Sequence, residues 1–244
     1  MLTLSTYPLL AWLGLGLAAF LVGLSKTLLP GVNTVSVAIF AGIMPAKIST
    51  GALLLLLILG DGMALAAYRR SAHWPSLIRM IPAVLLGLAL GALFLHLAQD
   101  QQVRRSIGLL LLALMLFTLL PKRKKQKPAQ VLTWVYGSLG GFSSMLANAG
   151  GPVMSLYFLA RRFDLPAFLG TAAWFFASMN LLKLPFSLSL GLINQEVILV
   201  DAVLAPLVLA GGALGYYWAA RIEQEVFNKL IILLTLAGAL YLLR

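Results

Sequence analysis

The residues best suited to chemistry lie in two short polar stretches that interrupt long apolar runs. The first supplies hydroxyl, amide and ammonium groups and comprises Ser25, Lys26, Thr27, Gly31 and Asn33. The second begins 118 residues later and comprises Ser143, Ser144, Asn148, Gly150 and Gly151. Hydroxyl, amide and ammonium groups donate hydrogen bonds to anions, and glycines let a ligand approach the backbone closely. We therefore interpret the two stretches as parts of one anion-binding site.

Both polar stretches contain residues that break helices, with Pro30 in the first and Pro152 in the second. Backbone groups freed by a break inside a membrane are tolerated only where they are buried in protein or line a wet cavity. We expect new helices to begin near Val32 and Val153 and to direct unpaired N–H groups and a partial positive charge toward that cavity. The alternative is that proline and glycine merely kink packed helices. Matched breaks in two halves favour a binding site.

Two lysines within apolar runs are candidates for charge in this site. Lys26 lies beside the first break, where a lysine costs about 2.5 to 3.5 kcal/mol on insertion scales unless it faces water, a carboxylate or substrate. The alternative is that it reaches out to the membrane boundary. Lys183 follows Asn180 by three residues, so both lie on one helical face and form a plausible anion clamp. Pro185 nearby leaves open that Lys183 sits at a boundary instead.

Asp61 is the one acid well inside an apolar run. It is a candidate for carrying a coupling proton, for pairing with a lysine, or for a helix-end role near the surface. Thr50 and Thr171 occupy equivalent places in the two halves, and their hydroxyls would complete the site from both sides. A hydrogen bond back to the helix backbone is the alternative for each threonine.

The elements that position these residues must be membrane-spanning helices. The chain of 244 residues is 61% hydrophobic and 10% charged, with a mean hydropathy of +0.97. At about 20 apolar residues per crossing, there is room for about eight crossings and no separate soluble domain. The net charge of +11 comes from basic residues in short gaps, which excludes a nucleic-acid partner and indicates orientation signals. The absence of cysteine excludes disulfides and thiol chemistry.

The apolar runs divide into two similar halves. Residues 1–120 form a first membrane repeat, 121–130 a basic cytoplasmic linker, and 131–244 a second repeat. Ser25 aligns with Ser143, and Pro82 aligns with Pro206. The runs at 32–44 and 152–160 are too short to cross alone, so each is expected to form a hairpin with the run before it. An odd number of crossings per half inverts the second repeat relative to the first.

The predicted fold is therefore an all-α polytopic membrane protein with two inverted-topology repeats. Each repeat comprises a broken-helix hairpin and three transmembrane helices. Basic residues place the loop flanked by Arg69, Arg70 and Arg79 in the cytoplasm, together with the five Lys and Arg of residues 122–127. By the same count both termini lie outside the cytoplasm.

Catalytic signatures are sparse. His73 and His96 are the only histidines, and neither belongs to a metal or phosphate motif. Ser143 lies in a Gly-Phe-Ser-Ser stretch similar to that of an intramembrane serine protease, but no later span supplies a histidine base. We expect no catalytic residue, no metal and no cofactor.

Four motifs give the chain its resemblance to a known family. They are Gly-Leu-Ser-Lys at 23–26, Pro-Ala-Lys-Ile-Ser-Thr-Gly at 45–51, Gly-Gly-Phe-Ser-Ser at 140–144 and Asn-Ala-Gly-Gly-Pro at 148–152. With the duplicated layout, they make nearly the whole chain resemble the sulfite exporter TauE/SafE family of bacterial membrane permeases. Leu28-Leu29-Pro30 departs from the small residues that this family often shows in the first break.

The resemblance implies transport of small sulfur oxyanions or organosulfonates across the bacterial cytoplasmic (inner) membrane. We expect a secondary transporter that exports sulfite, or an organosulfonate such as sulfoacetate, by alternating access around a midplane site. Its partners would be the anion, the lipid bilayer, and a coupling proton or another ion. The alternatives are a passive anion channel or an importer of a related oxyanion such as thiosulfate. The oligomeric state is left open.

Overall fold

The computed structural model describes residues 7–103 and 129–223 without a gap, and isolated positions near 105–113 and 225–233. Every regular element in this part of the chain is a helix. Residues 121–128 of the expected basic linker lie outside the described residues, as do most residues of the apolar runs at 103–120 and 226–243.

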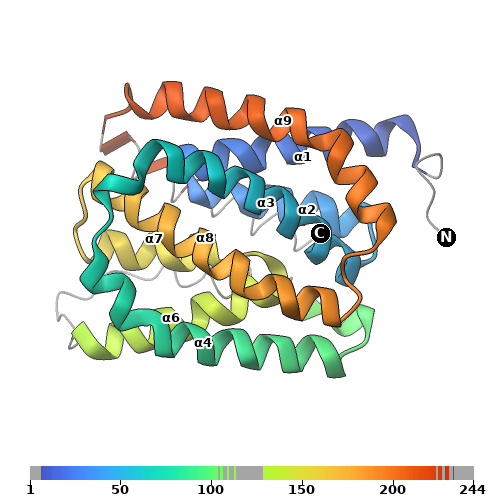
Figure 1. Cartoon of the computed structure of the whole chain (residues 1–244), viewed down its shortest axis with the longest axis horizontal. Helices are drawn as coiled ribbons and strands as arrows, with labels where there is room; N and C mark the ends of the chain where they lie inside the picture. The colour runs from blue at the N-terminus through green and yellow to red at the C-terminus, as the bar shows by residue number, and fades with distance from the viewer. Residues whose placement is uncertain are drawn as a thin grey trace.

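The described helices follow one another in the same order in the two halves (Figure 1). The first half contains α1 (Leu9–Thr27), η2 (Pro30–Val32), α2 (Asn33–Ile43), α3 (Ala46–Tyr68), η3 (Arg69–Ser71) and α4 (Trp74–Leu97). The second half contains α6 (Ala129–Ala147), α7 (Gly150–Ala160), α8 (Leu165–Ser189) and α9 (Gln195–Ala219).

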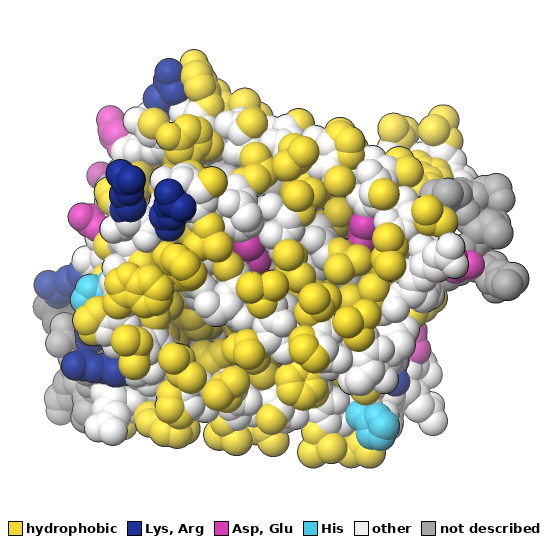
Figure 2. Space-filling model, in the orientation of Figure 1, with side chains coloured by type: hydrophobic (Ala, Val, Ile, Leu, Met, Phe, Trp, Pro, Cys, Tyr) yellow, Lys and Arg dark blue, Asp and Glu magenta, His cyan; other side chains and the backbone are white. Residues whose placement is uncertain are grey.

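The long helices have the length and composition of membrane spans. Among the described residues, five stretches meet both criteria, namely α1, α3 continued by η3, α4, α8 and α9. Their outer faces expose large apolar side chains such as Leu90 and Val203. Figure 2 shows hydrophobic side chains over the flank of the bundle and most of the visible Lys and Arg toward one end. The chain is therefore a multi-pass membrane protein.

Local sequence sets where several helices begin. Asp164 caps α8 by accepting a hydrogen bond from the Ala167 N–H, and Asn194 caps α9 in the same way from Val197. α7 begins at Gly150, three residues before the expected start near Val153. Pro152 falls within the first turn, where its missing N–H leaves no intrahelical bond unmade.

Each predicted break is a real interruption followed by a short helix. α1 ends at Thr27, and Pro30 begins the 3-10 turn that leads into α2, which packs against α1. Likewise α6 ends at Ala147, and α7 starts after two residues and packs against α6. The short runs are therefore partners of the preceding helices, as the sequence predicted.

Helix contacts repeat between the two halves. α1 packs along α9, and α6 packs along α4. In the predicted repeat α6 corresponds to α1, and α9 corresponds to α4. A methyl group on Gly23 would clash with the Val208 carbonyl, and one on Gly141 would clash with the Val84 carbonyl. Gly141 lies 118 residues after Gly23, and Val84 lies 124 residues before Val208. These are the offsets that align the two halves in sequence. These matched contacts support the predicted repeat.

The direction of the helices bears on the predicted inversion. In Figure 1, α1 leads away from the end marked N, whereas α6 begins at the opposite end of the bundle. α4 and α9 also run in opposite senses in this view. From this arrangement we propose that the two repeats are inverted relative to one another.

Candidate anion-binding site

Polar residues from both halves meet at a small cavity between the two breaks. Its volume is about 20 Å³, which is room for about one water molecule. The lining comes from six α-helices and both breaks, and includes Ser25, Lys26, Pro30, Asn33, Asp61, Ser144, Asn148, Gly151, Phe176 and Asn180. The structure thus brings together residues that lie more than 100 positions apart in the sequence.

Lys26 and Asp61 form a buried ion pair at one side of the cavity. The Lys26 Nζ lies 2.6 Å from the Asp61 Oδ1, and the two side chains are 7% and 3% exposed. The other carboxylate oxygen of Asp61 accepts a hydrogen bond of 2.6 Å from the Asn180 amide. The Lys26 ammonium also lies 4.9 Å from the centre of the Phe176 ring. This burial excludes a boundary position for Lys26 and a surface helix-end role for Asp61.

Lys183 does not line the cavity but lies directly behind two residues that do, and it is only 2% exposed. Its ammonium donates to the Asn148 Oδ1 at 2.6 Å, to the Ser144 Oγ at 3.0 Å and to the Ser144 carbonyl at 3.1 Å. Among the described residues it forms no ion pair. Because it is buried, the Lys183 side chain does not extend to the membrane boundary. Its positive charge is contacted only by neutral oxygens within the described structure.

The two breaks contact one another through their amides and backbone. The Asn33 amide donates to the Asn148 carbonyl at 2.8 Å, and the Asn148 amide donates to the Thr50 carbonyl at 2.8 Å. Asn148 adopts a left-handed backbone with φ of 52°, which asparagine tolerates better than most residues. A methyl group on Gly151 would lie 2.6 Å from the Pro30 carbonyl, so glycine is required for this close approach.

The charged groups at and directly behind the cavity sum to a positive charge. Lys26, Lys183 and Asp61 together carry a net formal charge of +1. α7 begins here without a side-chain cap, so its first-turn N–H groups add the partial positive charge of a helix N-terminus. A site of this kind favours an anion.

Other predicted site residues of the first half make local contacts. Ser25 lines the cavity, but its hydroxyl donates to the Val22 carbonyl at 2.7 Å. The Thr27 hydroxyl donates to the Gly212 carbonyl of α9 at 2.8 Å, and the Gly31 carbonyl accepts from Thr34. The Thr50 hydroxyl bonds back to the Lys47 carbonyl at 2.7 Å. Of these residues, Ser25 alone lines the cavity.

In the second half, the Ser143 hydroxyl donates to the Gly140 carbonyl at 3.3 Å, one turn back on its own helix. A methyl group on Gly150 would lie 3.1 Å from the Ser144 Cβ, so this glycine allows tight packing behind the cavity. The Thr171 hydroxyl accepts from the His73 N–H at 2.9 Å and ties α8 to the start of α4. Neither Ser143 nor Thr171 lines the cavity.

Sequence reasoning missed Phe176, whose ring contributes to the cavity and faces Lys26. Its signal was available, because Phe176, Asn180 and Lys183 are spaced by four and three residues and share one face of a helix. Leu57, Ala172 and Ala173 also line the cavity. Small and apolar residues inside an apolar run carry no such signal. Within the described ranges, no group of His, Cys, Asp or Glu could hold a metal ion.

A bundle of membrane-spanning helices with two interrupted helices and a buried polar cavity between the interruptions has the organisation of a membrane transporter. The chain belongs to the family described as Sulfite exporter TauE/SafE, whose family model matches residues 15–242. No curated protein and no solved structure gives a significant match.

Proposed function

We propose that the chain is a secondary transporter that exports a small sulfur-containing anion, either sulfite or an organosulfonate such as sulfoacetate. The observation that carries this proposal is a buried cavity that Lys26 of the first half lines directly, while Lys183 of the second half bonds to Ser144 and Asn148 in its lining. Family membership supports the sulfur chemistry. Hydroxyl, amide and ammonium groups are suitable donors to the oxygens of a sulfite or sulfonate.

Asp61 competes with the substrate for Lys26. While Asp61 is ionised it holds the Lys26 ammonium at 2.6 Å, and the site carries a net charge of +1. A proton on Asp61 would release Lys26 and raise the net charge to +2, which suits a doubly charged anion. Proton binding and anion binding would then favour one another, so the two would be carried together, and the membrane potential would drive export through the net negative charge of a dianion with one proton. This linkage is our proposal for coupling, with Asp61 as the proton carrier.

Transport requires the cavity to open. A sulfur oxyanion has at least four heavy atoms, whereas the present cavity has room for about one water molecule. We propose that the block containing α1 and α9 rocks against the block containing α4 and α6. This motion would separate the two breaks and open the cavity first to one side of the membrane and then to the other. The close contact between Pro30 and Gly151 would part in this motion.

The same enclosure argues against a passive channel. A channel needs a continuous pore, whereas direct contacts between the two breaks leave only the small cavity between them. A carrier also predicts counterflow, in which unlabelled anion on one side accelerates the movement of labelled anion from the other. Flux without counterflow would favour the channel. Uptake driven by the natural gradients would favour an importer, for example of thiosulfate.

The decisive experiment is transport of labelled sulfite, sulfoacetate and thiosulfate in proteoliposomes with imposed pH and voltage gradients. We expect Lys26→Ala and Lys183→Ala each to lower the rate at least about tenfold, because each removes a charge-assisted hydrogen bond worth about 1.5 to 3 kcal/mol. Lys229→Ala is the control, since Lys229 is exposed and pairs only with Glu225 in the described structure. Wild-type rates in both cavity variants would refute the site.

A further inference from the structure

A second cavity opens at the arginine-rich end of the molecule. It lies between α4, α6 and α7 and has a volume of about 410 Å³, within the range of small-molecule sites. Its lining is polar and aromatic and includes Arg79, Arg161, Gln130, Thr133, Tyr157 and Trp134. None of these residues lines the central cavity.

Two arginines give this second cavity its chemistry. In the described part of the chain, neither Arg79 nor Arg161 forms an ion pair with a carboxylate. Behind them, the Thr133 and Tyr157 hydroxyls are buried and lie 3.2 Å apart. Guanidinium groups bind phosphate through paired hydrogen bonds. The lining therefore suits a phosphate-bearing anion.

Comparison with the other repeat shows that packing does not require this polar lining. When the two halves are aligned by the offsets of 118 and 124 residues, five lining residues correspond to apolar residues of the other half. The counterparts of Gln130, Thr133, Tyr157, Arg161 and Arg79 are, in that order, Trp12, Leu15, Ile39, Ile43 and Val203. There Ile43 fills the space beside α1, with its Cδ1 only 3.0 Å from where a methyl group on Gly14 would lie. The polar cavity is thus specific to one end.

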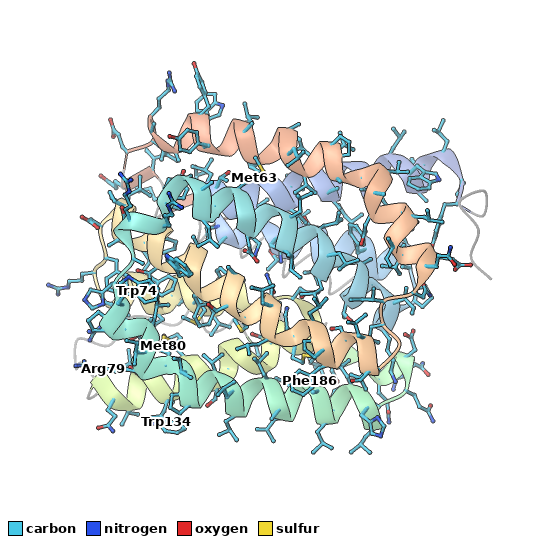
Figure 3. All side chains as sticks on the ribbon, viewed as in Figure 1. Met63, Trp74, Arg79, Met80, Trp134 and Phe186 are labelled. Atoms are coloured by element: carbon cyan, nitrogen blue, oxygen red, sulfur yellow. The ribbon has the colours of Figure 1, made fainter. Side chains whose placement is uncertain are left out.

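The flank of the second cavity is apolar and exposed. Ile81 is 51% exposed on α4, and Val131 and Trp134 are each 45% exposed on α6. Figure 3 shows Arg79 and Trp134 at the same end of the molecule, on the adjacent helices α4 and α6. A phospholipid would fit both the arginines and the apolar flank, with its phosphate on the arginines and its acyl chains along α4 and α6. Arginine beside exposed apolar side chains is typical of a membrane interface.

We propose that the second cavity binds a phosphate group through Arg79 and Arg161, and the apolar flank favours a phospholipid headgroup over free phosphate as its source. The site is separate from the central cavity, because Thr133 precedes Ser144 by eleven residues, or about 16 Å along α6. A bound headgroup would bridge α4, α6 and α7. It would brace α6, which carries Ser144, and α7, which follows Asn148, so it would act on both partners of Lys183.

The test is direct binding to the purified, detergent-solubilised protein, and it needs no transport. Native mass spectrometry would measure retention of phosphatidylglycerol, and thermal stabilisation would measure binding of inorganic phosphate. We expect the double variant Arg79→Gln/Arg161→Gln to bind phosphatidylglycerol at least about tenfold more weakly than wild type. The control is Arg221→Gln, because Arg221 lies outside the cavity and stacks on Tyr217.

Each outcome either identifies the source of the phosphate group, a phospholipid or free phosphate, or refutes the site. If wild type and the control retain the lipid and the double variant loses it, the result supports a phospholipid headgroup as the ligand. Stabilisation by phosphate alone, lost in the same variant, supports free phosphate as the ligand. If the double variant does not fold, Arg79→Lys/Arg161→Lys keeps the charge and loses the paired hydrogen bonds, so weaker binding is still expected. Binding unchanged by these substitutions, or no binding to wild type, would overturn the proposal.

Discussion

At the scale of single residues, the central feature is a buried charge pair whose partners lie 35 residues apart. Lys26 and Asp61 each remove the penalty of burying the other. Such a pair adds little net stability compared with apolar side chains of similar size, but losing one partner leaves an unpaired charge and costs about 3 to 5 kcal/mol. Stability and transport should therefore respond differently to substitutions in this pair.

The first prediction separates these two effects. Lys26→Met should lower the unfolding temperature markedly, because Asp61 is left buried without its cation. Adding Asp61→Leu should restore much of the lost stability, whereas transport should stay at least about tenfold below wild type. Thermal unfolding and counterflow, measured on the same preparations, check both parts. A single variant as stable as wild type would show that the pair is not buried as described.

Asp201 on α9 is a second buried acid and a source of instability. It is 6% exposed, and neither carboxylate oxygen has a hydrogen-bond partner in the described structure. The offset of 124 residues places Leu77 at the equivalent position of the other repeat. Burying a polar group without a hydrogen bond costs about 1 to 3 kcal/mol by mutational data.

The second prediction follows from this position. Asp201→Leu should raise the unfolding temperature, because an apolar side chain replaces an unpartnered carboxyl group where the other half of the fold already accommodates leucine. Differential scanning fluorimetry measures the change, and Asp164→Leu at the α8 cap is the contrasting variant that should lower it. Destabilisation by Asp201→Leu would indicate that the carboxyl group has a partner.

At the scale of helices, backbone contacts at glycine hold the two long pairs together. Gly23 brings α1 against α9, and Gly141 brings α6 against α4. Each pair also carries part of the site, since Lys26 follows Gly23 by one turn and Ser144 follows Gly141. Small residues at such interfaces let the backbones approach, which is a main source of helix association in lipid.

The third prediction concerns this packing. Gly23→Ala should destabilise the protein by about 1 to 3 kcal/mol, because the added methyl group meets the Val208 carbonyl and forces the helices apart. Transport should fall with it, since Lys26 moves with α1. Gly42→Ala is the matched control, because nothing lies within 4 Å of its new methyl group. Equal unfolding temperatures for the two variants would contradict the close contact.

At the scale of the whole molecule, the proposed inversion places the two ends of the bundle on opposite sides of the membrane. The connection between α3 and α4, where Ser71 is exposed, lies at the arginine-rich end. The connection that follows α4, where Gln99 is exposed, lies at the other end. Basic residues favour the cytoplasmic side for the first.

The fourth prediction uses the absence of cysteine from the sequence. In intact cells an impermeant maleimide should label Gln99→Cys, whereas Ser71→Cys should react only after the membrane is opened. Transport by each variant confirms that it is folded. Labelling of both positions from the same side would reject a single crossing of the membrane by α4, and reversed labelling would invert the assigned orientation.

The membrane class, the helix breaks and the duplicated order could be predicted because they depend on local composition. Apolar runs must span lipid as helices, and Pro30 and Pro152 must interrupt or start them wherever the chain goes. The partners of Asp61 could not be predicted, because a proton carrier, an ion pair and a helix-end role all fit the same short stretch. Thr50 and Thr171 were equivalent in sequence, yet they make different contacts.

By itself the sequence determined that this chain crosses the membrane several times and that two of its helices are interrupted beside polar residues, and it predicted two similar halves. Only the tertiary structure decided that Lys26 is paired with Asp61 and that Lys183 is held by neutral oxygens of Ser144 and Asn148. Hydrophobic span length and helix breaking act over one or two turns. The pairing of charges depends on which helices pack together, and that is set by contacts between residues far apart in the chain.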